Sequence, residues 1–162
     1  MIDKFYDALT DVYKSADDLM PSYESNPCEK CNLCCRRIEN LGIDRLELDY
    51  IAEFERRRNA DMSVFHKFEE FMKGETSRRF GKQCPFFSES LKGCSIYEAR
   101  PLACRTFACF INEKIKASLP KCCLIGGRTV CYNDSDFAEK LPFVISFYHL
   151  SSEYSEFCKS LK

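Results

Sequence analysis

The 162 residues are enough to bury a hydrophobic core within one domain, so disulfides are not needed in place of a core. Lys and Arg (24) nearly balance Asp and Glu (25), which excludes a net basic field that would attract nucleic acid or an anionic membrane. No stretch approaches the ~18 apolar residues of a membrane span, and the acidic N-terminal residues do not match a signal peptide. We therefore expect a cytoplasmic protein with no nucleic-acid or membrane partner.

The first predicted element is an amphipathic helix over residues 2–20. Apolar side chains recur there at three- and four-residue steps, which places them on one stripe, and Pro21 ends the pattern. A stripe of this kind is typical of a helix that faces a core, and a partner-binding face is the alternative. A polar loop over residues 22–27 then leads to the first cysteines.

The second predicted helix begins at a capping box. Asp44 and Glu47 have the spacing of that motif, and the helix should end near three arginines at residues 56–58, whose charge suits the negative end of the helix dipole. A solvated helix end explains these arginines better than a nucleic-acid patch. The side chains expected on the buried side are Leu48, Ile51 and Phe54, flanked by Leu46 or Ala52.

A third helix and a hairpin are predicted next. Asp61 or Ser63 can cap the helix, and Gly74 closes it. From Cys84 onward the pattern changes to two short strands or extended arms, separated by a polar turn. Such a hairpin would hold Cys84 and Cys94 near each other.

The rest of the chain is predicted to be mostly helical. Pro101 suits the first turn of a new helix, and residues 107–119 can continue as a helix or as a broken one. Residues 122–131 are rich in turn signals, and a last helix is expected over about 136–159, where Pro142 can introduce a break or kink. The predicted fold class is mostly α with a small irregular β-hairpin.

The cysteines are the main chemical signal. Twelve cysteines in a reducing compartment indicate thiolate ligands or redox groups rather than a disulfide framework. Cys28, Cys31 and Cys34 share a period that can wrap a single ion or one iron–sulfur cluster. Cys35 follows directly, and adjacent side chains point in different directions, so either one of Cys34 and Cys35 is spare or two centres exist.

Downstream cysteines can complete a site. Cys84, Cys94 and Cys104 are spaced ten residues apart, and Cys122 or Cys123 brings the candidates to eight. Eight thiolates allow two four-cysteine sites, two iron–sulfur clusters, or one site and a reactive pair. Thiolate ligands suit zinc or iron and exclude magnesium and calcium, but they do not distinguish zinc from an iron–sulfur cluster.

Charged and weaker candidates surround these ligands. Positive charge near the thiolates would come from Arg36, Arg37, Arg100 and Arg105. Ordinary surface pairing with acidic residues is the alternative for each arginine. Three cysteines are expected to pack in the core rather than to ligate: Cys109, Cys131 and Cys158. His66 and His149 are expected to be hydrogen-bonded structural residues outside the site.

The order of these motifs resembles that of a known family. Cys28-x2-Cys31-x2-Cys34-Cys35 is followed by Cys84-Pro-Phe-Phe and then by Gly93-Cys94-Ser-Ile-Tyr-x2-Arg100-Pro101-x2-Cys104-Arg105. This pattern resembles the cysteine-cluster family described as a zinc- or iron-chelating domain, the YkgJ-type CxxCxxCC proteins. That family usually has Gly where this chain has Leu33, and Pro shortly after the Cys-Arg pair, where this chain has Ala108-Cys109. The second departure keeps Cys109 in consideration as a ligand.

The resemblance implies metal chelation by a cysteine-cluster module over about residues 28–123. We expect one metal-stapled domain over residues 1–162, in which the helices over 2–20 and about 136–159 flank the module and offer surfaces to a protein partner. The cofactor would be zinc or an iron–sulfur cluster in a structural or electron-carrying role. The expected metal ligands are Cys28, Cys31, Cys34 or Cys35, Cys84, Cys94, Cys104 and Cys123.

Two other functions remain open at the level of sequence. One is an enzyme that uses iron or an iron–sulfur cluster for redox or methyl-transfer chemistry; the methyl-transfer alternative comes from longer members of the family that are linked to protein lysine methylation. The other is a metal carrier, whose site would exchange metal readily. The chain has no Ser-His-Asp set, nucleotide loop or dinucleotide fingerprint that would favour the enzyme.

Overall fold

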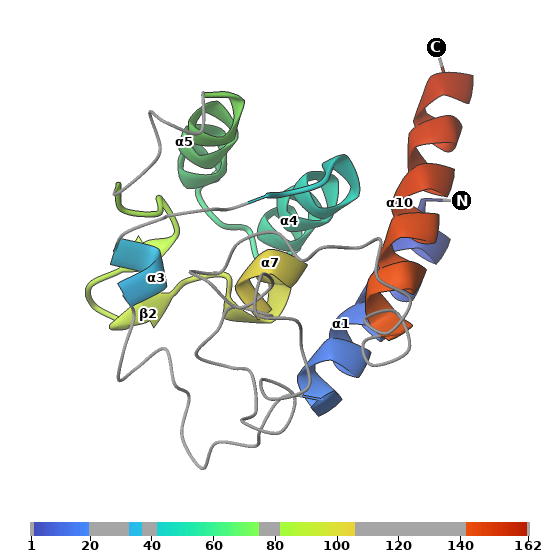
Figure 1. Cartoon of the computed structure of the whole chain (residues 1–162). Helices are drawn as coiled ribbons and strands as arrows, with labels where there is room; N and C mark the ends of the chain where they lie inside the picture. Colours follow the sequence, from blue (N-terminus) through green and yellow to red (C-terminus); the bar gives the residue numbers. More distant parts are fainter. Residues whose placement is uncertain (1, 20–32, 37–41, 75–81, 106–141, 162) are drawn as a thin grey trace.

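The structure is a computed structural model that describes residues 2–19, 33–36, 42–74, 82–105 and 142–161 (Figure 1). These residues are mostly helical and include one small antiparallel sheet, which confirms the predicted secondary-structure class. The predicted loop over residues 22–27, the segments 107–119 and 122–131, and the first part of the last helix lie outside the described residues. In chain order the elements are α1 (Asp3–Leu19), α3 (Leu33–Arg36), α4 (Arg45–Arg57), α5 (Met62–Lys73), β1 (Phe87–Ser88), β2 (Gly93–Cys94), the 3-10 helix η1 (Tyr97–Ala99), α7 (Leu102–Arg105) and α10 (Pro142–Ser160).

The first hydrophobic core lies where α1 packs along α10 (Figure 1). The apolar stripe that the sequence shows on α1 is buried there, so this stripe faces a core. The ring of Phe5 lies 5.2 Å from that of Tyr154 and 5.3 Å from that of Phe157, between centroids. The buried side chains of α1 are Phe5, Tyr6, Leu9, Val12, Tyr13 and Ala16.

Helix α4 joins this core to a second one. Its predicted capping box is present, because the Asp44 carboxylate accepts from the Leu46 amide at 2.9 Å and the Asp44 amide donates to Glu47 at 3.3 Å. The predicted buried side is only partly right: Ile51 is buried, whereas Leu48 and Phe54 are partly buried. The reason is that α4 packs on two sides, with Leu46 in the first core and Ile51 and Ala52 in the second.

The second core is formed by α4, α5 and the hairpin segment. Asp61, and not Ser63, caps α5, since its carboxylate accepts from the Ser63 amide at 2.9 Å. Phe65 and Phe68 are buried, and the Phe68 ring lies 4.7 Å from that of Phe86. This packing joins α5 to the residues that lead into β1.

The predicted hairpin is the sheet of the structure. Phe87 pairs with Cys94 and Ser88 with Gly93, and Lys92 has the positive φ of 49° that closes the turn between them. The short 3-10 helix η1 was not predicted. It connects the hairpin to α7, whose position after Pro101 agrees with the predicted helix start.

Candidate metal centre

Two predicted ligands lie on the hairpin. Cys94 is the last residue of β2, and Cys84 lies three residues before β1. The Phe87 amide donates to the Cys84 carbonyl at 3.0 Å, and Phe87 is the residue paired with Cys94. Both thiols are partly buried. The hairpin therefore fixes the backbone of both cysteines within one small unit.

The paired-cysteine segment meets this unit across a long sequence separation. The Cys84 amide donates to the Cys35 carbonyl at 2.7 Å, which places the end of α3 beside the hairpin (Figure 1). Arg36 strengthens the contact: its guanidinium lies 4.7 Å from the centre of the Phe87 ring and 3.0 Å from the Glu89 carboxylate. The Arg36–Glu89 pair is exposed, which agrees with surface pairing, one of the two roles expected for this arginine.

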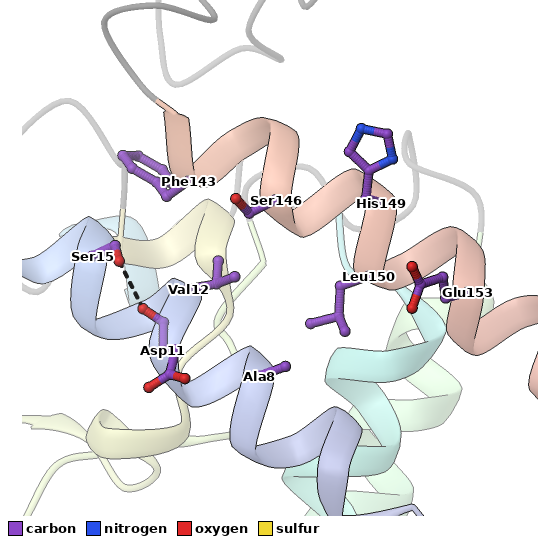
Figure 2. A pocket seen from close by; sticks show the side chains of 9 residues that line it. All are labelled: Ala8, Asp11, Val12, Ser15, Phe143, Ser146, His149, Leu150 and Glu153. Carbon is purple, nitrogen blue, oxygen red and sulfur yellow. Dashed lines mark hydrogen bonds between the residues drawn. The ribbon is translucent and has the colours of Figure 1, made fainter.

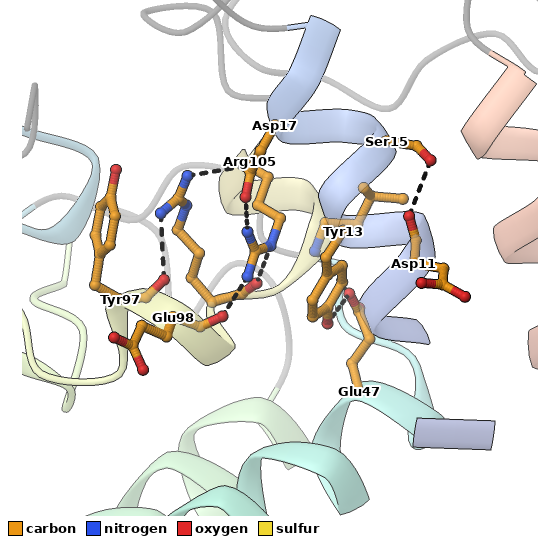
Figure 3. Close-up of polar contacts among 10 residues, drawn as sticks. Asp11, Tyr13, Ser15, Asp17, Glu47, Tyr97, Glu98 and Arg105 are labelled. Atoms are coloured by element: carbon orange, nitrogen blue, oxygen red, sulfur yellow. Dashed lines mark hydrogen bonds and ion pairs between the residues drawn. The ribbon is translucent and has the colours of Figure 1, made fainter. Parts of the chain in front are cut away.

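Cys104 lies on α7, between two buried arginines. Arg100 is 7% exposed and Arg105 is 4% exposed, so surface pairing is the wrong expectation for both. Arg105 donates to the carbonyls of Arg100 and Glu98, and Arg100 donates to the Tyr97 carbonyl at 3.2 Å. These bonds fold the segment before α7 around the two guanidinium groups (Figure 3).

Helix α1 supplies the partners that make this burial tolerable. The Asp17 carboxylate bridges the two arginines: one oxygen accepts from Arg100 at 3.2 Å and the other accepts from Arg105 (Figure 3). The Arg105 guanidinium also lies 4.1 Å from the centre of the Tyr13 ring, and the Arg100 guanidinium 3.8 Å from that of Tyr97. A paired carboxylate and aromatic faces offset the desolvation of guanidinium better than an apolar pocket would.

Glu47, which the sequence assigns to the capping box, is also buried, and the sequence pattern did not predict its burial. It is 2% exposed and accepts from the Tyr13 hydroxyl at 2.9 Å and from the Leu102 amide at 2.6 Å. Leu102 is the first residue of α7, so Glu47 caps α7 as well as taking part in the capping box at Asp44. Burial raises the pKa of Glu47 to about 7, and the bonds from Leu102, Asp44 and Tyr13 oppose that rise.

The remaining predicted residues fall in different places. Cys28, Cys31, Arg37, Cys109, Cys123 and Cys131 lie outside the described residues, whereas Cys34 lies on α3. Cys158 packs partly buried against the first core, as expected for a structural cysteine. His66 and His149 are exposed. Within the described ranges, no three His, Cys, Asp or Glu side chains are grouped closely enough to hold a metal ion.

A surface groove lies between parts of α1 and α10, which otherwise pack together (Figure 2). Its volume is about 410 Å³, and Ala8, Val12 and Leu150 line it from the two helices. His149 and Asp11 also border the groove, but Figure 2 shows them on opposite sides of it. None of the cysteines in the described ranges lines the groove.

The chain was compared with known proteins. A family model named CxxCxxCC, with the description "Putative zinc- or iron-chelating domain", matches residues 27–135. That range contains every predicted ligand and excludes α1 and α10. No curated protein and no solved structure shows a significant match. Among the described helices, none combines the length and the apolar character needed to cross a bilayer.

Proposed function

Since the chain belongs to the CxxCxxCC family of zinc- or iron-chelating domains, we propose that it holds zinc or an iron–sulfur cluster through cysteine thiolates, in a structural or electron-carrying role. The match covers more than half of the chain and includes all the candidate thiols. Thiolates are the ligands that zinc and iron–sulfur clusters share, so the donor set agrees with the chemistry in the family description.

The observation that carries the proposal is the backbone bond from the Cys84 amide to the Cys35 carbonyl, at 2.7 Å. It joins two of the family's cysteine motifs, and the hairpin register adds Cys94 to the same region. The described thiols do not form a complete site by themselves. The proposal therefore takes further ligands from Cys28, Cys31 and Cys123, with Cys104 contributed by α7.

Only one of the two adjacent cysteines on α3 is expected to ligate the same centre as the hairpin cysteines. Consecutive side chains on an α-helix point about 100° apart. Cys34 and Cys35 occupy consecutive positions of α3, so one of them ligates the ion or cluster formed with Cys84 and Cys94. The other is either spare or a ligand of a second centre. When bound, zinc would supply a closed cross-link, and an iron–sulfur cluster would add the capacity to transfer one electron.

A metal would be the strongest connection between α3 and the hairpin. The contacts that join them include a backbone bond, an exposed ion pair and a cation–π contact, each worth on the order of 1 kcal/mol. Structural zinc sites contribute ~10 kcal/mol or more at neutral pH. The thiolate centre would therefore fix the relative position of these segments more strongly than any one of these contacts.

The proposal is tested by metal analysis of protein purified without oxygen. Zinc without colour would indicate a closed thiolate site, whereas iron, acid-labile sulfide and a reducible visible spectrum would indicate a cluster. The variants Cys84→Ser and Cys94→Ser should lose metal, because each removes a thiolate on the hairpin. Cys158→Ser is the matched control, since Cys158 packs against the first core on α10 and should keep full metal content.

Full metal content and unchanged stability in both hairpin variants would contradict the proposal. The rate of metal loss to a competing chelator separates the roles. A slow loss supports a structural or electron-carrying centre, whereas rapid exchange supports the metal-carrier alternative. A centre with a vacant coordination position would favour an enzyme.

A further inference from the structure

Helix α1 contacts the element that carries Cys104 although it lies outside the family match. The match begins at residue 27, whereas α1 spans Asp3–Leu19. Even so, Asp17 bridges Arg100 and Arg105, on either side of Cys104. In this chain, a residue outside the family match therefore helps to hold the segment of a predicted ligand.

The orientation of Cys104 depends on its neighbours because α7 is only 4 residues long. Helices of this length are not stable by themselves, so bonds from other elements must hold α7 in place. Arg105 follows Cys104 directly and is held by Asp17, the Glu98 carbonyl and the Arg100 carbonyl. The backbone that presents the Cys104 thiol is thus fixed through Arg105.

Asp17 is the acidic residue that pairs with both buried arginines. Both arginines are buried: Arg105 is 4% exposed and Arg100 is 7% exposed. The Asp17 carboxylate supplies the negative charge that faces both of these guanidinium groups. Removing the Asp17 charge would leave two guanidinium groups in close proximity without the carboxylate that bridges them.

From these contacts, and resting on the proposed function, we propose that Asp17 is a positioning residue for the metal ligand Cys104 and acts through Arg105 and Arg100. Residues that orient the ligands of a metal typically change its affinity by about 10- to 100-fold when they are altered. Coupling of this kind is reciprocal, so metal binding at Cys104 would also stabilise the docking of α1 on α7.

The test compares Asp17→Asn with Asp18→Asn. Asp18 is exposed on the same helix, so its replacement removes the same charge without touching the arginines. The probe is Zn²⁺ in competition with a chelator, or Fe²⁺ with sulfide if the purified protein is brown. Asp17→Asn should weaken metal binding by about 10- to 100-fold relative to Asp18→Asn, and Asp17→Glu should restore most of it.

Two further measurements separate positioning from general stabilisation. In the cobalt-substituted protein, Asp17→Asn should weaken the thiolate-to-metal charge-transfer band, because Cys104 is displaced. Hydrogen exchange of the α1 amides in the wild-type protein should slow when metal is added; this measurement does not require the variant to fold.

The outcomes distinguish this inference from the proposed function. Equal metal affinity and equal cobalt spectra in Asp17→Asn and Asp18→Asn would overturn the role of Asp17, even if the melting temperature of Asp17→Asn fell. Unchanged exchange of α1 on metal addition would overturn the reciprocal coupling. A wild-type protein that binds neither zinc nor iron would overturn the proposed function together with this inference.

Discussion

Glu47 shows how one side chain can serve several elements. Its carboxylate accepts from Tyr13 on α1, from Leu102 at the start of α7 and from the amide of Asp44 at the start of α4. Three segments distant in sequence therefore converge on one buried acid. A buried carboxyl group with such partners is expensive to leave unsatisfied, so these bonds specify how the segments meet.

The raised pKa of Glu47 predicts a pH dependence of stability. The pKa is 4.5 in the unfolded reference and about 7 in the folded protein, so the folded state favours the protonated acid. The stabilisation from this group is complete below pH 4.5 and is lost as the pH rises through about 7. At ~1.4 kcal/mol per pKa unit, the loss is on the order of 3 kcal/mol.

Chemical denaturation of metal-loaded protein across this pH range measures the effect. The variant Glu47→Gln cannot titrate, so the part of the slope that belongs to Glu47 should be absent from it. Glu153→Gln, at an exposed position of α10, should keep the wild-type slope. Equal slopes in wild type and Glu47→Gln would contradict the assignment. Comparing proteins loaded with the same metal cancels the pH dependence of the thiols.

The buried charged residues mark the limit of prediction at the residue scale. The sequence assigns Glu47 to a capping box and leaves Arg100 and Arg105 either near the thiolates or in surface pairs. It does not predict that they are buried, because charged side chains are rarely buried unless they are paired. The partners that make burial possible, Tyr13 and Asp17, lie on α1, far away in the sequence. Only the fold brings them together, so no local pattern could have shown this network.

The elements themselves were largely predictable because their signals are local. Asp44 with Glu47, Asp61 and Pro101 each act within a few residues, and each marks a helix start in the structure. The hairpin was also predictable, since its polar turn separates two short apolar arms. The 3-10 helix η1 was not predicted because it has no sequence pattern of its own. Hydrogen bonds from Arg100 and Arg105 to its carbonyl groups hold it instead.

Capping at Asp44 should contribute more to stability than capping at Asp61. Both carboxylates accept from the amide two residues later, but Asp44 also accepts from the Ser151 hydroxyl on α10 at 2.7 Å. Asp44→Ala should therefore lower the free energy of unfolding by about 2 kcal/mol, from the cap and the bond to Ser151. Asp61→Ala, which loses only local bonds to Ser63, should cost less.

Denaturant unfolding of the two alanine variants measures this difference. A double-mutant cycle isolates the contribution of α10: adding Ser151→Ala to Asp44→Ala should cause little further loss, whereas Ser151→Ala alone should destabilise the protein. Equal losses in Asp44→Ala and Asp61→Ala would show that the bond to Ser151 has no energetic role.

At the scale of the whole molecule, α4 lies between two cores, of which only the first includes helices outside the family match. The first core contains α1 and α10, which lie outside the family match, and the second is built from α4, α5 and the hairpin segment, inside it. The sequence predicted which residues are apolar in each element. It did not predict this division, because hydrophobic periodicity shows which face of a helix is buried but not which helix covers it.

The sequence names candidate donors for the site but does not predict how the segments that carry them meet. Spacing identified the cysteines. In the structure, backbone hydrogen bonds join Cys35 to Cys84 and Cys84 to Phe87, the residue that pairs with Cys94. The proximity of α3 to the hairpin depends on contacts between segments about 50 residues apart, such as that of Arg36 with Glu89. Such contacts leave no periodic signal in the sequence.

The α1–α10 core should be sensitive to the loss of a single aromatic ring. Phe5 is 4% exposed and packs against Tyr154 and Phe157, so Phe5→Ala should lower the free energy of unfolding by about 3 to 4 kcal/mol. Ile2→Ala is the control, because Ile2 is 38% exposed and its truncation should cost less than about 1 kcal/mol. Thermal or denaturant unfolding measures both, and similar losses would mean that the aromatic cluster does not stabilise the fold.

The pairing of α1 with α10 also determines when the protein can finish folding. Helix α10 is synthesised after every other described element, whereas α1 is synthesised first among them. At ~5–20 residues per second, ribosomes need on the order of ten seconds to make the chain between the two helices. During that interval the aromatic stripe of α1 has no access to its partner. The nascent chain should therefore bind chaperones through this stripe, and release should follow the emergence of α10.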